Sequence, residues 1–195
     1  MPEVVGDQVK QTPQTTYGVT KTMCELMIND YTRKGYIDGR SARLPTVIIR
    51  PGKPNQAASS FVSGVFREPL NGEDFELPVS VDPGMPLLGY RAIVDNIIRL
   101  HELEKNQLKD DRAVSLPSHT VSVQNMIDAL RAAAGHRRLG EITVKPDPFI
   151  EQICAGWPQD CEHSLAHSFG STQEENLEDV VSYFIQDYHC FEILF

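Results

Sequence analysis

The chain has 195 residues, 41% of them hydrophobic, so it can fold around its own core and bury about 70% of the surface that the unfolded chain exposes. Its net charge of -9 argues against a broad nucleic-acid or anionic-membrane surface, because binding phosphates requires clustered lysines and arginines. No apolar run is long enough to span a bilayer, and the first residues lack the pattern of a secretory leader. We therefore expect a cytoplasmic protein without nucleic-acid or membrane partners.

The cysteines predict free thiols rather than a disulfide framework or a zinc site. They are spread along the chain at Cys24, Cys154, Cys161 and Cys190. No Cys-x-x-Cys pair occurs. Cys161 is followed by His163 and His167, a spacing that zinc can use, but no fourth ligand is evident. The sequence therefore predicts no metal site.

The first third of the chain predicts a loop, a helix, a strand and a second helix. Apolar residues recur at helical spacing over residues 16–34, and Gly35 ends the pattern. A β-rich run follows at residues 44–50, and Pro51-Gly52 closes it, as is typical of a buried parallel strand. Asn55 is expected to cap the next helix, whose apolar face reaches about residue 66.

The rest of the chain continues the alternation of helix and strand. Residues 71–89 are rich in proline and glycine, so we expect loops there, with a short strand at 75–79. His101 falls on the apolar stripe of the following helix and is expected to be a hydrogen-bonded core histidine. The later elements are predicted as helices at 91–104, 122–134, 148–155 and 177–188 and strands at 113–116 and 142–144. This alternation predicts an α/β protein with right-handed crossovers.

Tyr17 and Lys21 are the candidate chemical pair. They lie four residues apart at the start of the first helix, so their side chains share one face, about 5–6 Å apart at Cβ. A phenol is a poor base at neutral pH, because its unperturbed pKa is about 10. A neighbouring ammonium stabilises the phenolate and lowers that pKa, which permits proton exchange with a substrate hydroxyl. The same spacing also fits an exposed contact that only stabilises the helix.

The sequence around this pair resembles the extended short-chain dehydrogenase/reductase family, in the NAD-dependent epimerase/dehydratase group. The family pattern is a proline, a short gap, Tyr-x-x-x-Lys and a glutamate, and Pro13, Tyr17, Lys21 and Glu25 follow it. Further segments are similar to the D-erythronate dehydrogenase-like branch, namely residues 38–40, 43–55, 57–61 and 67–70. The match is dense over residues 2–79, and weaker echoes continue beyond it.

The resemblance implies the carboxy-terminal half of a Rossmann-type doubly wound sheet with a small α+β substrate-binding lobe. Residues 1–70 would complete the NAD-binding Rossmann domain. Residues 71–195 would form mainly the substrate-binding lobe, with Rossmann elements returning near 90–116. Helices at 16–34 and 57–66 resemble the pair through which such enzymes form a homodimer.

The resemblance also implies an NAD-dependent oxidoreductase acting on a secondary alcohol of a small sugar acid similar to D-erythronate. Tyr17 would exchange the proton, and Lys21 would assist it and bind the ribose of NAD. Pro51 and Gly52 would lie beside the nicotinamide, at the carboxyl end of a strand. The implied substrate-binding residues are Asn55, Ser59, Ser60 and Arg91. Asn55 fits a helix cap equally well, the two serines fit a first helical turn, and Arg91 fits a surface helix.

Three parts of the family pattern have no counterpart in this sequence. They are the Gly-x-x-Gly-x-x-Gly turn that binds a pyrophosphate, the acidic residue that binds a ribose, and the Ser or Thr upstream of the catalytic tyrosine. Two alternatives therefore stay open. One is a nucleotide-sugar epimerase or dehydratase, and the other is a catalytically inactive, truncated homologue or a binding or oligomerisation module. The exact substrate and the choice between NAD and NADP are also left open.

Overall fold

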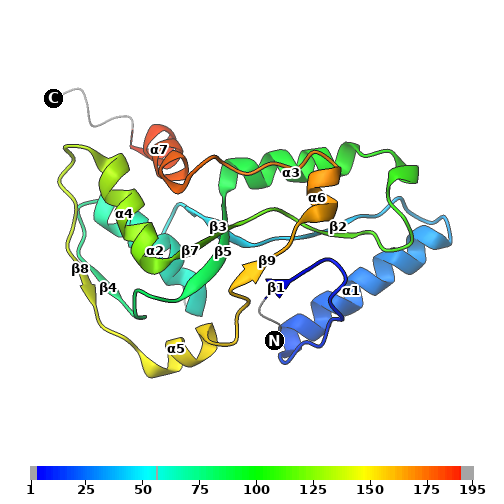
Figure 1. Cartoon of the computed structure of the whole chain (residues 1–195), viewed down its shortest axis with the longest axis horizontal. Coiled ribbons are helices and arrows are strands. Elements are labelled where there is room, and N and C mark those ends of the chain that lie inside the picture. The colour runs from blue at the N-terminus through cyan, green and yellow to red at the C-terminus, as the bar shows by residue number, and fades with distance from the viewer. Residues whose placement is uncertain (1–3, 56, 190–195) are drawn as a thin grey trace.

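The computed structural model describes residues 4–55 and 57–189. In chain order their elements are β1 (Val4–Val5), α1 (Thr16–Arg33), β2 (Ser41–Arg43), β3 (Thr46–Ile48), the 3₁₀ turn η1 (Ala58–Ser60), α2 (Phe61–Leu70), β4 (Phe75–Leu77), β5 (Gly84–Gly89), α3 (Tyr90–Glu102), the 3₁₀ turn η2 (Lys105–Gln107), β6 (Ala113–Ser115), β7 (His119–Ser122), α4 (Val123–Ala134), β8 (Ile142–Val144), α5 (Pro148–Cys154), β9 (Asp160–Cys161), α6 (Ser164–Ser168) and α7 (Leu177–Tyr188) (Figure 1). No described helix is long and apolar enough to cross a membrane.

Short strand pairs form the β structure. β5 is the central strand of a three-stranded sheet, parallel to β3 on one side and antiparallel to β7 on the other. β2 and β6 form a second parallel pair, and only Leu44 and Pro45 separate β2 from β3. The pairs β1 with β9 and β4 with β8 are also parallel. The prediction of an α/β protein is therefore confirmed.

The main core lies where α2, α4 and α7 pack together. Figure 1 shows these three helices gathered at one end of the molecule, with α1 at the other. Phe66 of α2 and Phe184 of α7 are among the largest side chains fully buried there. Every residue of α2 is buried. Because α2 ends at Leu70 and shares this core with α4, residues on both sides of the predicted boundary at 70 pack together, and that boundary itself stays a prediction.

Capping residues fix where two of the helices begin. Thr15 accepts a hydrogen bond from the backbone N–H of Gly18 at 3.1 Å at the start of α1. Ser122 and Asn125 form a reciprocal capping box at the start of α4. Gly35 follows α1 with a φ of 78°, a conformation that favours glycine. These helices match their predicted ranges closely.

α1 keeps an apolar stripe exposed. Only Thr32 of the helix is buried. The exposed apolar residues on α1 include Val19, Met23, Leu26, Met27 and Tyr31. We call this set the α1 stripe.

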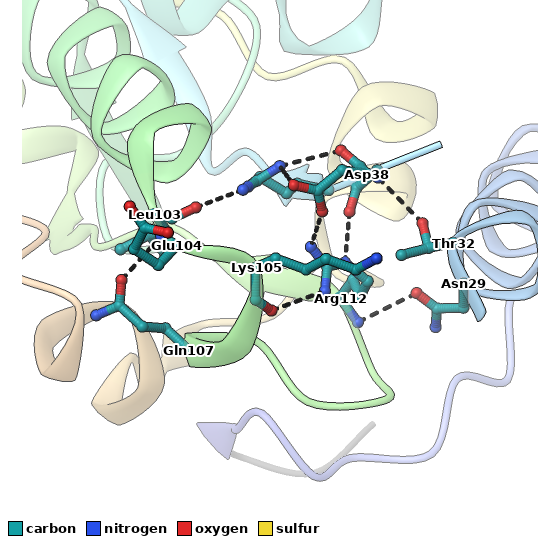
Figure 2. A network of polar contacts seen from close by, with 10 residues as sticks. Asn29, Thr32, Asp38, Leu103, Glu104, Lys105, Gln107 and Arg112 are labelled. Carbon is teal, nitrogen blue, oxygen red and sulfur yellow. Dashed lines mark hydrogen bonds and ion pairs between the residues drawn. The ribbon is translucent and has the colours of Figure 1, made fainter. Parts of the chain in front are cut away.

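A polar network around Arg112 ties the far end of α1 to the loops beside it (Figure 2). The guanidinium of Arg112 donates to the carbonyls of Gly39 and Lys105 and forms an ion pair with Asp38. The backbone N–H of Arg112 donates to Asn29 of α1 at 3.1 Å. Arg112 is thus a buried cation that hydrogen-bonds three separate segments of the chain.

Three predictions about local structure were wrong. Residues 84–89 were expected to be loop, but they form β5. Asn55 does not cap a helix, because the turn after it begins at Ala58 with Ala57 as its N-cap. Its side chain instead accepts a hydrogen bond from the backbone N–H of Ala57 at 2.9 Å. His101 is exposed rather than part of the core, because it lies on the outer side of α3 near its end.

Candidate active site

Tyr17 and Lys21 lie together on the first turns of α1. The ammonium of Lys21 lies 5.4 Å from the centre of the Tyr17 ring. Tyr17 is 73% exposed, so its phenol is open to a ligand. Among the described residues, neither the Tyr17 hydroxyl nor the Lys21 ammonium has a hydrogen-bond partner. Both groups are therefore free to bind other molecules.

Tyr17 borders a cavity of about 520 Å³, which we call the tyrosine cavity. It is lined by residues from both halves of the chain: Val5, Tyr17, Arg43, Leu44, Pro45, Thr46, Ser59, Pro86, Ser115, Leu116, Trp157, Pro158, Cys161 and His163. Of the predicted substrate residues, only Ser59 lines it. Because Thr46 is the first residue of β3, the cavity lies beside the amino end of this strand. The sequence suggested a site at the carboxyl end of the strand instead.

Asn55 and Ser60 line a different cavity of about 460 Å³ on the other side of η1. This second cavity lies between α2 and α5 and includes Phe61, Phe75 and Phe149. Ser59 and Ser60 are neighbours in the 3₁₀ turn, yet each contributes to a different cavity. η1 is therefore a wall between the two spaces, and the structure does not bring the three predicted substrate residues into one pocket.

Pro51 and Gly52 lie in the exposed segment that follows β3. Gly52 has a φ of 89°, and an added Cβ there would meet no atom within 4 Å. The backbone N–H and carbonyl of the neighbouring Arg50 are both hydrogen-bonded. Its N–H donates to Ser63 Oγ at 3.1 Å, and its carbonyl accepts from Arg67 at 2.9 Å. The structure places Pro51 and Gly52 outside the lining of both cavities.

The Arg91 side chain binds α7 and lies outside the lining of both cavities. Its guanidinium donates two hydrogen bonds to Asp187 of α7, at 3.0 and 2.6 Å, and lies 4.3 Å above the Tyr183 ring. The hydroxyl of Tyr90 also donates to Asp187. These bonds from Arg91 and Tyr90 hold the pKa of the Asp187 carboxyl below its ordinary value. Arg91 thus anchors α7 and lines neither cavity.

An ion pair between α1 and β2 borders the tyrosine cavity, and the sequence did not predict it. Glu25 accepts two hydrogen bonds from Arg43, at 2.9 and 2.7 Å, and a third from Gln11 at 2.6 Å. Burial alone would raise the pKa of Glu25, but the bonds from Arg43 and Gln11 outweigh it and lower the pKa. The pair fixes α1 against β2 and so sets where Tyr17 stands.

His163 is a second polar group that the sequence did not single out for this cavity. It precedes α6 and is buried, and its Nε2 lies 2.8 Å from Ser118 Oγ. Its spacing from Cys161 and His167 suggested only a weak metal pattern and not a place in this cavity, because its burial depends on segments far away in the chain. Cys24, Cys154 and Cys161 are free thiols, whereas Cys190 lies outside the described residues. The described His, Cys, Asp and Glu residues include no group of three placed to hold a metal ion.

The sequence is similar to curated dehydrogenases along nearly its whole length. D-erythronate dehydrogenase from Haemophilus influenzae is 42% identical over 186 residues, which cover 95% of this chain and 59% of that protein. The enzyme of the same name from Cupriavidus necator is 38% identical, covering 96% of this chain and 58% of the relative. The chain is thus similar along nearly its whole length to proteins of the extended short-chain dehydrogenase/reductase group. It spans about three fifths of the length of these relatives.

Solved structures of the short-chain dehydrogenase/reductase type have the same fold as this chain. A nucleoside-diphosphate-sugar epimerase from Agrobacterium tumefaciens superposes with a TM-score of 0.91 at 36% identity, covering 97% of this chain and 55% of the other. A GalE-like L-threonine dehydrogenase from Cupriavidus necator gives a TM-score of 0.82 at 20% identity, which shows the fold alone. The predicted Rossmann-type fold is confirmed. No protein-family model matches the sequence.

Proposed function

We propose that this chain carries the proton-transfer half of an NAD-dependent oxidation of a secondary alcohol in a small sugar acid such as D-erythronate. One observation carries the proposal: Tyr17 lines a cavity, with the Lys21 ammonium beside its ring on the same helix face, in a chain 42% identical to a D-erythronate dehydrogenase. Exposure and freedom from hydrogen bonds support the roles of both groups.

The proton moves through this chain's own residues. Tyr17, as phenolate, accepts the proton of the substrate hydroxyl while the adjacent carbon becomes a carbonyl. Lys21 stabilises the phenolate by its positive charge. Ser59, which lines the cavity, would donate a hydrogen bond to the substrate. The ion pair of Glu25 with Arg43 keeps the helix that carries Tyr17 in position.

The residues present fit one end of NAD. The Lys21 ammonium, which has no hydrogen-bond partner among the described residues, suits the hydroxyls of a ribose. Gly52, a predicted cofactor residue, follows β3 and lines neither cavity, so it does not add to this fit. When bound, NAD accepts the hydride from the carbinol carbon. The sequence contains no glycine-rich turn for the pyrophosphate, so the fit is to a ribose alone.

Epimerase chemistry is the second candidate, favoured by the 36% identity to a structure described as a nucleoside-diphosphate-sugar epimerase. The same tyrosine and lysine would serve it, since an epimerase removes and returns a hydride at one carbon. The two reactions differ in their products. Oxidation accumulates NADH, whereas epimerisation leaves the NAD pool unchanged.

We also propose that the α1 stripe forms a homodimer interface. α2 cannot share in it as the sequence suggested, because all its residues are buried within one chain. Exposed apolar residues that lie together on one surface are typical of protein interfaces. Met23→Glu should therefore lower the dimer fraction in sedimentation experiments, while Ile98→Glu, an exposed residue of α3, serves as the matched control. An equal effect of both changes would contradict an interface at α1.

The proposed chemistry is tested by NADH formation from D-erythronate and by calorimetric titration of NAD. Tyr17→Phe should reduce the rate by about 10²–10⁴-fold, because it removes the proton acceptor. Tyr36→Phe is the matched control, since Tyr36 is 70% exposed and lines neither cavity. Equal rates for the two variants would refute the role of Tyr17. Absence of both NAD binding and NADH formation would favour a binding or oligomerisation module.

A further inference from the structure

Arg43 brings a permanent positive charge to the tyrosine cavity. It is the last residue of β2, and its side chain is 28% exposed. Among the described residues that line the cavity it is the one arginine or lysine, and the lining includes no Asp or Glu. Hydroxyl groups such as those of Thr46 and Ser115 leave this charge uncompensated at the wall. The lining therefore favours an anionic ligand.

The guanidinium of Arg43 is held in place by one of its hydrogen-bonding edges. Nε donates to Glu25 at 2.9 Å, and the terminal nitrogen Nη2 donates to the other oxygen of the same carboxylate at 2.7 Å. Gln11 donates to Glu25 as well, at 2.6 Å. A bidentate pair of this kind fixes the plane of the guanidinium. The cation is thus oriented before a ligand binds.

The other edge of the Arg43 guanidinium is unused. A guanidinium carries five N–H groups, and the pair with Glu25 takes two of them. Nη1 has no hydrogen-bond partner among the described residues, and it is not one of their buried atoms that lack a partner, so it is accessible. Nη1 and the remaining N–H of Nη2 form an end edge that matches the two oxygens of a carboxylate. Arg43 can therefore bind Glu25 and a ligand carboxylate together.

The charges around Arg43 leave room for one further carboxylate. Its hydrogen bonds to Glu25 raise the pKa of Arg43 above the ordinary value against the effect of burial, and Asp111 and Asp7 add to the rise through space. Neither Asp111 nor Asp7 lines the cavity. Lys21 supplies a second cation, 5.4 Å from the centre of the phenol ring. Glu25 neutralises one of the two cations by direct hydrogen bonds, and a bound carboxylate would neutralise the other.

We propose that the free edge of Arg43 binds the carboxylate of a sugar-acid substrate whose secondary hydroxyl lies at Tyr17. The assignment rests on the proposed function, since it adds a carboxylate subsite to the cavity that Tyr17 lines. The carboxylate gains two charge-assisted hydrogen bonds that a hydroxymethyl group cannot reproduce, so the cavity selects an acid over a neutral polyol. Arg43 is then a specificity-determining residue, and Glu25 is a positioning residue that keeps the guanidinium in its plane.

The test compares an acid with its uncharged counterpart in the absence of NAD. D-erythronate and erythritol, which has a hydroxymethyl group in place of the carboxylate, are titrated calorimetrically into the protein. The wild type should bind D-erythronate about tenfold more tightly, as expected for hydrogen bonds from a charged and partly exposed donor. Arg43→Gln should weaken binding of D-erythronate by about tenfold and leave that of erythritol within about twofold of the wild type.

Two control variants separate binding from positioning. Glu25→Gln breaks the same ion pair but keeps the cation, so it should retain the preference for the acid. Arg33→Gln removes a charge from an exposed site on α1 that is not part of the cavity lining, and it should bind like the wild type. If Arg43 were merely structural, Arg43→Gln and Glu25→Gln would instead weaken binding of both probes alike.

Several results would overturn the carboxylate subsite. They are equal affinities of the wild type for the two probes, no binding of either probe, and an unchanged preference in Arg43→Gln. If Arg43→Gln does not fold, Arg43→Lys decides, because an ammonium keeps the charge but lacks the two-edged fork. Its preference should be smaller than that of the wild type, and an equal preference would count against Arg43. Because NAD is absent from these titrations, the role of Tyr17 is judged separately by NADH formation.

Discussion

Replacing Arg112 with alanine should strongly destabilise the fold, because its buried guanidinium ties its own strand to two other segments, at residues 38–39 and at Lys105 (Figure 2). The side chain is 5% exposed and donates to the carbonyl of Gly39 at 2.6 Å and to that of Lys105 at 3.3 Å. Each bond from a charged donor contributes about 1.5–3 kcal/mol, with the longer one at the low end. Asp38 is 43% exposed, so water can replace its partner and its loss adds little. The sum is about 3–4 kcal/mol.

The measurement is urea unfolding followed by circular dichroism. Arg112→Ala should lower the free energy of unfolding by that amount, which corresponds to a melting temperature about 6–16 °C lower in a chain of this size. Arg33→Ala is the matched control, since Arg33 is 69% exposed and forms only a surface pair with Asp30. It should change stability by less than about 1 kcal/mol. A loss below that value for Arg112→Ala would show that the network in Figure 2 does not hold these segments together.

Three further outcomes follow from packing and charge. Phe66→Ala, at a fully buried site, should cost about 3–5 kcal/mol in urea unfolding, and a loss under about 1 kcal/mol would contradict the core described above. Gly140→Ala should lower the melting temperature, because the new Cβ would lie 2.0 Å from the Glu73 carbonyl oxygen; an unchanged value would mean that this approach is not as close as described. The lowered pKa of Glu25, caused by Arg43 against the opposing effect of burial, contributes stability that is complete above the unfolded carboxyl pKa of about 4.3 and is lost as the pH falls through the folded pKa. The stability difference between wild type and Glu25→Gln should therefore be largest at neutral pH and shrink in acid, and a difference independent of pH would contradict it.

Helices with strong local signals could be predicted from the sequence. α4 begins at its capping serine and ends before Gly135, and the predicted range at 177–188 is that of α7. Caps and apolar periodicity are properties of neighbouring residues, so they can be read without tertiary information. The i,i+4 relation between Tyr17 and Lys21 was predictable for the same reason.

The central strand could not be predicted, because its local composition favours a turn. β5 includes Gly84, Pro86 and Gly89. Pro86 is tolerated because the pairing with β3 begins only at Leu87, so one side of the strand needs no donor at the proline. The buried Leu88 shows that packing against β3, and not intrinsic propensity, makes this segment a strand.

The cavities could be predicted only in part. Ser59 and Ser60 are adjacent, but the rotation between successive residues of the 3₁₀ turn places them in different cavities. His163 contacts Ser118, which lies 45 positions earlier in the chain, so no sequence spacing reveals the contact. Arg91 was expected near a ligand, but its partner Asp187 comes from the last helix. Each of these placements depends on long-range packing.

Isotope transfer tests most directly whether Tyr17 enables hydride transfer in this chain. The protein is incubated with NAD and with D-erythronate deuterated at its carbinol carbons, and the nicotinamide product is analysed by mass spectrometry. Deuterated NADH should form with the wild type and with Tyr36→Phe, and should be reduced by about 10²-fold or more with Tyr17→Phe. Equal deuterium incorporation by Tyr17→Phe and the wild type, or no incorporation by the wild type, would contradict the proposed oxidation.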